Sequence, residues 1–279
     1  MAAQAPALRI RALTLMDVLD ESFRIYRANF PLLAGLSILL AIPLLAITLL
    51  SGTTTVLSAI YPSALNPTAT PPDLTGSNPF IGLLQYPVQL ALLPFSVAAL
   101  YAATVPIILG RPVTIWSALR AVLRRYWGLL ALGFLYSLTS VALACPPLGI
   151  WLLTRLSLLF PAVFTEEASI GTAIERTWRL TDRAFWRTFA VLLLSYLLVF
   201  TLEYSLATVF LVVAFVFPSL PVAVRVFLIV AVASLMAQLV QPLLSIAVTL
   251  LYFDLRVRRE AFDLEVMAYQ LATAEGSGS

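Results

Sequence analysis

The chain has 279 residues, of which 61% are hydrophobic and only 11% are charged, a composition too apolar for an ordinary soluble domain. All 17 basic side chains are arginine and histidine is absent, so the usual general base and metal ligand is missing. The single cysteine, Cys145, excludes an intrachain disulfide and a thiolate metal cluster. Composition therefore predicts a polytopic membrane protein.

The first predicted unit pairs an amphipathic helix with a membrane span. Residues 14–30 carry apolar side chains on one helical stripe and charges off it, with Thr14 as the expected N-cap. The apolar run of residues 31–50 then has the length of roughly 20 residues that a helix needs to cross the hydrocarbon core. Residues 51–79 are rich in Ser, Thr, Pro and Asn, and predict an external loop.

The next span completes the first hairpin, and a second surface helix follows it. Residues 80–110 return across the membrane and carry Gln85 and Gln89 one helical turn apart. Residues 114–126 form a second amphipathic segment, with three arginines, and residues 127–144 a third span. This half of the chain therefore predicts a surface helix between two crossings.

The fourth predicted span, residues 149–164, is short and carries Arg155 in its middle. It leads into residues 165–188, a charged amphipathic segment set between apolar runs. We interpret this segment as a helix on the cytoplasmic membrane surface that joins one transmembrane hairpin to the next.

The fifth span, residues 190–217, contains Glu203, and the sixth, residues 223–253, contains Gln238 and Gln241. A charged continuation follows, in which helical ion pairs can form among Asp254, Arg258 and Glu260. The fold class expected is an all-α bundle of six transmembrane helices. One integral membrane domain is expected over residues 1–271, followed by a flexible tail or linker, residues 272–279.

The arginines predict the orientation. Fifteen of the 17 fall on one side of the six-span arrangement, in four segments: residues 9–27, 111–125, 176–187 and 256–259. The positive-inside rule therefore places both termini in the cytoplasm. Because these arginines lie beside apolar spans, we expect them to meet anionic lipid headgroups and not nucleic acid.

Three segments of the sequence are similar to one another. We align the segments on their capping residues, Thr14, Thr114 and Ser169. After the cap, the three segments have apolar residues at the same first positions, and each segment precedes a transmembrane hairpin. This favours three repeats of a surface helix plus a transmembrane hairpin. The alternative is that any amphipathic helix produces matching apolar positions.

Each segment also carries an arginine at the same place near the end of its helix: Arg24, Arg124 and Arg179. Positive charge there complements the helix dipole and can reach a lipid phosphate or a partner. Helical ion pairing with Asp20 or Glu175, four residues earlier, is the simpler alternative.

Two charges fall deep inside predicted spans, Arg155 and Glu203, whereas Arg225 lies at the outer mouth of the sixth span. An unpaired charge in hydrocarbon costs several kcal/mol, so we hypothesise that they pair in the bundle interior. They would form a polar cluster with the four intramembrane glutamines, Gln85, Gln89, Gln238 and Gln241. The cluster would serve either to fix packing or to provide a pathway for a solute or a lipid headgroup.

The stretches FPAVFTEEASIGTAIERTWRLTDRAFWRTF and LYFDLRVRREAFDLE resemble the bacterial glycerophosphodiester phosphodiesterase membrane-domain family and its multi-pass relatives. The most specific parts are Pro161 with Glu166, and the run Tyr252-Phe253-Asp254-Leu255-Arg256. The resemblance implies the bacterial cytoplasmic (inner) membrane. It does not imply phosphodiesterase activity, because spans and connectors take all the length that a catalytic barrel would need.

No motif for chemistry stands out. The chain has no glycine-rich phosphate loop, HExxH or CxxC, and Glu166 and Glu167 are expected to flank the third surface helix. We therefore expect no enzyme, metal or cofactor, but a scaffold or accessory module for lipids or a membrane-protein partner. The alternative is a transporter or permease for a small solute or lipid. A scaffold predicts a packed bundle, whereas a transporter predicts a cavity that reaches Arg155 and Glu203.

Overall fold

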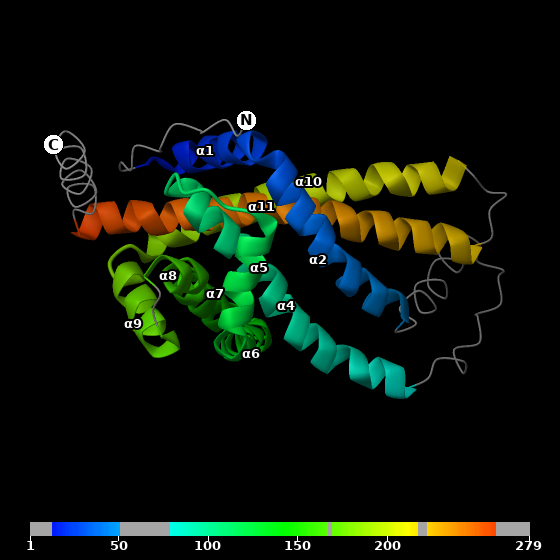
Figure 1. Ribbon diagram of the computed structural model, residues 1–279, viewed down its shortest axis with the longest axis horizontal. Helices are drawn as coiled ribbons and strands as arrows, with labels where there is room; N and C mark the ends of the chain where they lie inside the picture. Colours follow the sequence, from blue (N-terminus) through cyan, green and yellow to red (C-terminus); the bar gives the residue numbers. More distant parts are fainter. Residues whose placement is uncertain (1–12, 51–78, 167–168, 217–221, 261–279) are drawn as a thin grey trace.

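The computed structural model describes residues 13–50, 79–166, 169–216 and 222–260. Every regular element within these ranges is a helix, as the composition predicts. The elements, shown in Figure 1, are α1 (Leu15–Ala28), α2 (Phe30–Leu50), α4 (Pro79–Ile108), α5 (Ile115–Arg124), α6 (Tyr126–Ala142), α7 (Pro146–Leu156), α8 (Leu159–Glu166), α9 (Ile170–Thr181), α10 (Phe185–Val216) and α11 (Val222–Glu260). The predicted tail and nearly all of the predicted loop, residues 51–79, lie outside the described residues.

The three amphipathic helices α1, α5 and α9 begin where the sequence predicts their N-caps. The caps are Thr14, Thr114 and Ser169. The side-chain hydroxyl of each accepts a hydrogen bond from the backbone N–H three residues later. Such a bond satisfies a donor that the first helical turn leaves unpaired. The three predicted caps are therefore confirmed.

The same two positions of each amphipathic helix are buried against the rest of the molecule. They lie four and eight residues after the cap and are at most 2% exposed: Val18 and Ser22, Ala118 and Val122, Ala173 and Thr177. Residues four apart share one helical face, and short side chains there let the helix pack closely. This common pattern supports the threefold repeat, which stays a prediction.

α1 and α2 meet at a bend of 85°, visible where the blue helix turns in Figure 1. Asn29 lies at the bend, and its side-chain amide donates to the Ile25 carbonyl at 3.0 Å, which caps the end of α1. The Tyr26 hydroxyl donates to the Leu239 carbonyl of α11 at 2.7 Å. The bend therefore holds α1 against α11 while α2 leaves in a new direction.

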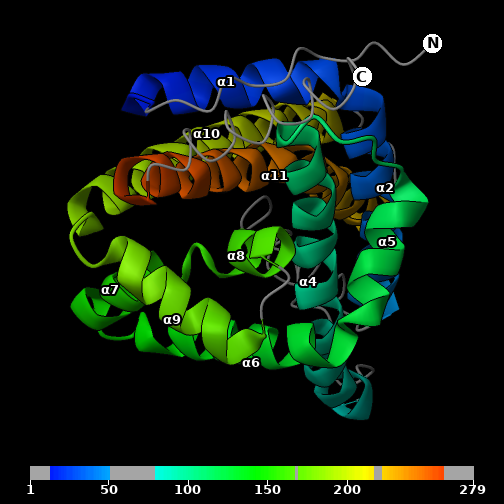
Figure 2. The same ribbon diagram turned by 60° about the vertical axis from the view of Figure 1, so that its left-hand side comes forward.

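α11 is the central helix of the molecule. It packs along α10 and also contacts α1, α2 and α4 (Figures 1 and 2). Its second half is buried, with Ile246, Leu250 and Tyr252 fully covered. Pro242 lies inside it. Because proline has no N–H, the backbone carbonyl of Gln238, four residues earlier, loses its helical partner.

Three helical stretches are long and apolar enough to cross a membrane: Pro146–Glu166, Phe185–Ser205 and Ala231–Arg259. The bent pair of α1 and α2 gives a fourth candidate. Two shorter apolar helices, Pro94–Ile108 and Tyr126–Thr139, lie within the second and third predicted spans. The described residues therefore support three or four spans, and the count of six stays a prediction.

α10 carries an apolar stripe on its outer surface. Leu193, Leu197, Phe200 and Tyr204 follow one another at helical spacing and are 46–56% exposed. In water such a row of large apolar side chains would favour aggregation, whereas lipid chains would cover it. The length of the apolar helices and this exposed stripe both indicate a membrane protein.

Candidate functional site

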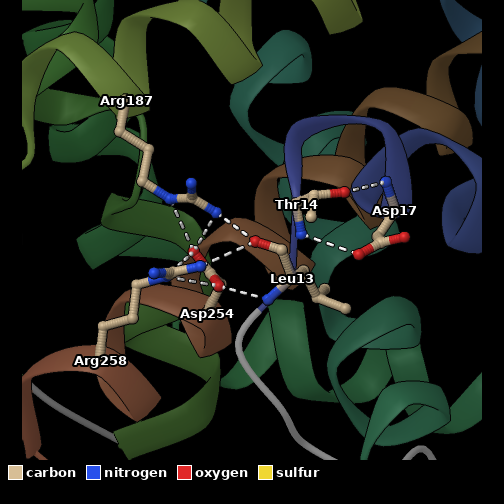
Figure 3. A network of polar contacts seen from close by, with 6 residues as sticks. All are labelled: Leu13, Thr14, Asp17, Arg187, Asp254 and Arg258. Atoms are coloured by element: carbon tan, nitrogen blue, oxygen red, sulfur yellow. Dashed lines mark hydrogen bonds and ion pairs between the residues drawn. The ribbon is translucent and has the colours of Figure 1, made fainter.

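The carboxylate of Asp254 on α11 is fully buried and binds three separate parts of the chain (Figure 3). The Leu13 N–H donates to its Oδ1 at 2.7 Å, and Arg187 Nε donates to its Oδ2 at 3.0 Å. Arg258 Nε donates to both carboxylate oxygens, at 3.0 and 3.2 Å, so one of the predicted helical pairs is confirmed. Both arginines also donate to the Leu13 carbonyl. The network ties the segment before α1 and the start of α10 to the end of α11.

A second carboxylate, Glu166 at the end of α8, links α9 to α11. Arg176 Nε donates to its Oε1 at 2.8 Å, and the Tyr252 hydroxyl donates to the same oxygen. Arg256 Nε lies 3.8 Å from that oxygen. Both arginine side chains are only 13% exposed, and charge-assisted hydrogen bonds are strong in such surroundings.

These two networks show that the residues that carry the family resemblance hold helices together. Glu166, Tyr252, Asp254 and Arg256 join α8, α9 and α10 to the end of α11. Sequence reasoning interpreted Glu166 as a flanking charge and missed Arg187 as a partner of Asp254. An aspartate one residue beyond a long apolar run was the signal that could have indicated a buried acceptor.

Arg155 is not brought together with Glu203. Its Nη2 donates to Asp182 Oδ1 at 3.1 Å, and its Nη1 donates to the Trp178 carbonyl at 3.2 Å. Its guanidinium also lies over the rings of Trp151 and Trp178, 5.7 and 5.3 Å from their centroids. The predicted pairing is corrected because α7 packs against α9 and thereby presents Arg155 to the residues at the end of α9.

A hollow of about 1060 Å³ lies between α9, the start of α10 and the end of α11. We call it the arginine hollow because five arginines line it: Arg179, Arg183, Arg187, Arg258 and Arg259. Glu175 and Asp182 line it too, but Asp182 also interacts with Arg155. Arg187 and Arg258 already bind the buried Asp254, but five arginines against these three acids still leave positive charge in excess. Guanidinium groups bind phosphate and carboxylate in bidentate geometry. The hollow is suited to an anion.

All five tryptophans are exposed, by 36–80%: Trp116, Trp127, Trp151, Trp178 and Trp186. Trp178 lines the arginine hollow, and Trp186 is the neighbour of Arg187 in the chain. Indole rings concentrate at membrane–water interfaces, where the ring contacts lipid and the N–H stays wet. Exposed indole rings such as these are typical of side chains at a membrane–water interface.

The other members of the predicted polar cluster are brought together in part. Gln238 and Gln241 line a hollow of about 330 Å³. Gln241 also lines an adjoining hollow of about 400 Å³ that contains Glu203. The side chains of Gln85 and Gln89 lie outside the described part of the chain. An open hollow at the surface of α10 therefore contains Glu203, while Arg155 belongs to another site.

The three arginines of the repeat differ in their surroundings. Arg24 forms an ion pair with Glu21 and not with Asp20, the partner that the spacing suggested. Arg124 is exposed in the last turn of α5. Arg179 lines the arginine hollow, so of the three it has the setting best suited to a lipid headgroup.

Among the described residues, no group of three His, Cys, Asp or Glu side chains lies where it could hold a metal ion. Glu167, the second acid of the predicted pair, lies outside them. Comparison with protein-family models, with curated proteins and with solved structures found no match. The resemblance to the phosphodiesterase membrane-domain family therefore stays a prediction.

Proposed function

We propose that the protein is a non-enzymatic membrane module that holds anionic lipid headgroups in the arginine hollow and so acts as a scaffold or accessory for lipids or a membrane-protein partner. One observation carries the proposal: five arginines and two acids line a single hollow of about 1060 Å³. A phosphate diester accepts several guanidinium hydrogen bonds at once, and anionic lipids attract about 1 kcal/mol per arginine near the surface.

The proposal includes six spans with both termini in the cytoplasm of a bacterial inner membrane. In this topology the turn at Cys145, between the third and fourth spans, lies on the outer side. Cys145 is exposed and is the only cysteine, so a membrane-impermeant maleimide should label it in intact spheroplasts. In a Cys145→Ser/Ser169→Cys variant, labelling should need permeabilised membranes. Labelling of Cys145 only after permeabilisation would contradict the topology and leave the lipid proposal standing.

The lipid proposal can be tested by native mass spectrometry of the full chain from nanodiscs with equal phosphatidylglycerol and phosphatidylethanolamine. The variant Arg183→Gln/Arg259→Gln removes two charges from the arginine hollow. At about 1 kcal/mol per arginine, we expect a roughly 30-fold weaker retention of phosphatidylglycerol.

Arg111→Gln/Arg120→Gln is the matched control, because both side chains are exposed and lie outside the hollow. It should retain phosphatidylglycerol as the wild type does. An equal loss in both double variants would mean diffuse attraction to the whole basic end, and no headgroup site.

Transport remains the second candidate, and one specific observation favours it. The two smaller hollows share Gln241 and Tyr196, and one of them contains Glu203. Transporter sites are typically polar pockets near the middle of the bilayer, often lined by helices that contain proline, and α11 carries Pro242 in its interior. Uptake of a solute by proteoliposomes, lost in Glu203→Gln, would support this second candidate.

A further inference from the structure

The hollow of about 330 Å³ is a site of a different kind from the arginine hollow. We call it the polar pocket, and it lies among α4, α6, α8, α10 and α11. Its polar lining residues are Tyr101, Tyr136, Tyr196, Gln238, Gln241, Ser245, Ser96 and Ser137, and apolar residues complete the lining. None of the described residues that line it is an acid or an arginine. Its volume is at the lower end of the range for small-molecule sites.

The polar pocket lies at mid-depth of two candidate spans. Tyr196 is near the centre of Phe185–Ser205, and Ser245 is near the centre of Ala231–Arg259. Two of its lining residues are open to the outside, Tyr196 at 46% and Val97 at 38% exposure. In a bilayer this opening would face lipid chains, so a ligand would enter sideways from the membrane.

Two amides in the pocket have unused hydrogen-bonding groups. Gln238 and Gln241 are partly exposed and make no hydrogen bond with any residue that the structure describes. The Ser245 hydroxyl, by contrast, donates to the Pro242 carbonyl at 2.9 Å. A polar group without a partner costs several kcal/mol in hydrocarbon. The backbone carbonyl of Gln238 is a further acceptor without its helical donor, because Pro242 has no N–H.

The adjoining hollow of about 400 Å³ continues the polar pocket along α10. The two share Tyr196, Gln241 and Leu244. Its other lining residues are apolar, among them Leu197 and Phe200, except for the acid Glu203. A polar chamber that opens into an apolar groove has the shape of a site for an amphiphile, with its head in the chamber and a chain in the groove.

The groups present select the chemistry of the head. A phosphate is disfavoured, because the pocket has no cation and a charge in hydrocarbon is costly. A head with acceptors alone would leave the two glutamine carbonyls unpaired, since they need a donor. We infer that the polar pocket binds an uncharged amphiphile that carries both a hydroxyl and a carbonyl, the chemistry of diacylglycerol. Tyr101, whose ring stacks on Phe160 at 5.4 Å, forms a flat wall for it.

The test uses the full chain in phosphatidylcholine nanodiscs with a trace of photoactivatable diacylglycerol, competed with unlabelled dioleoylglycerol. In the wild type, the label should map to peptides of α10 and α11 that carry residues 193–203 and 238–245. The double variant Gln238→Leu/Gln241→Leu removes both amides at similar volume. Loss of two hydrogen bonds to the ligand should lower specific labelling about tenfold.

Two controls separate the pocket from the rest of the molecule. Thr201→Val removes a hydroxyl from α10 outside both hollows, and Arg183→Gln alters only the arginine hollow. Both should label as the wild type does, so that failure of either proposal can be recognised separately. If the double variant does not fold, Tyr136→Phe, which removes one hydroxyl, should lower labelling about threefold.

Three results would overturn the inference. The first is undiminished labelling in the double variant, or in Tyr136→Phe where that variant replaces it. The second is label that maps outside the residues that line the polar pocket and the adjoining hollow. The third is equal competition by dioleoylphosphatidic acid, which would show that the site accepts a charged head. Competition by dioleoylglycerol alone, together with the loss in the double variant, would support it.

Discussion

The buried network around Asp254 makes the sharpest prediction. Asp254→Asn keeps the shape of the side chain and removes its charge, so Arg187 and Arg258 would face an amide that carries its own donors. Removal of one partner from a buried ion pair costs about 3–5 kcal/mol. Water screens part of this loss, because the two arginine side chains are 26% and 40% exposed. We therefore expect the free energy of unfolding to fall by about 2–3 kcal/mol.

The assay is unfolding by sodium dodecyl sulfate in dodecyl maltoside micelles, followed by circular dichroism. Hydrogen exchange at the Leu13 amide, which donates to Asp254, should accelerate in parallel. Asp182→Asn is the comparison variant: its carboxylate is 63% exposed, although the side chain of its partner Arg155 is only 11% exposed, so the loss should be smaller, about 1–2 kcal/mol. Equal losses in the two variants, or a loss below about 1 kcal/mol in Asp254→Asn, would refute the reasoning.

Further predictions concern packing, capping and depth. Gly133→Ala would place Cβ 1.9 Å from the Pro94 ring and should cost about 1–3 kcal/mol in the same unfolding assay, whereas Gly171→Ala, in open space, should stabilise by about 0.5–1 kcal/mol. A destabilising Gly171→Ala would contradict this. Thr114→Ala removes the cap of α5 and should cost about 1 kcal/mol, while a serine there should restore stability. Trp186, 77% exposed, should be quenched more strongly by lipids brominated near the headgroup than near the chain end; the reverse order would place it deep in the bilayer.

Local chemistry could be predicted from the sequence because its causes lie within a few residues of one another. Thr14 and Ser169 are recognised as caps since the hydroxyl bonds a backbone N–H only three positions away. The buried positions four and eight residues later follow from helical geometry. Apolar runs likewise predict where helices lie, although α7 and α8 divide the fourth span between them.

The partners of the charges could not be predicted, because they depend on how helices far apart in the chain pack together. Arg155 and Glu203 are adjacent only on a diagram of spans; in three dimensions α9 brings Asp182 to Arg155. Asp254 meets Leu13, 241 residues earlier, and no local pattern encodes that distance.

The sequence by itself determined that this is an apolar helical protein with three capped amphipathic helices, because composition, capping and periodicity act locally. Only the tertiary structure decided which residues share a site. Packing of α9, α10 and α11 forms the arginine hollow, and packing of α4, α6, α8, α10 and α11 encloses the polar pocket, since a cavity is shaped by surfaces that no single segment contains.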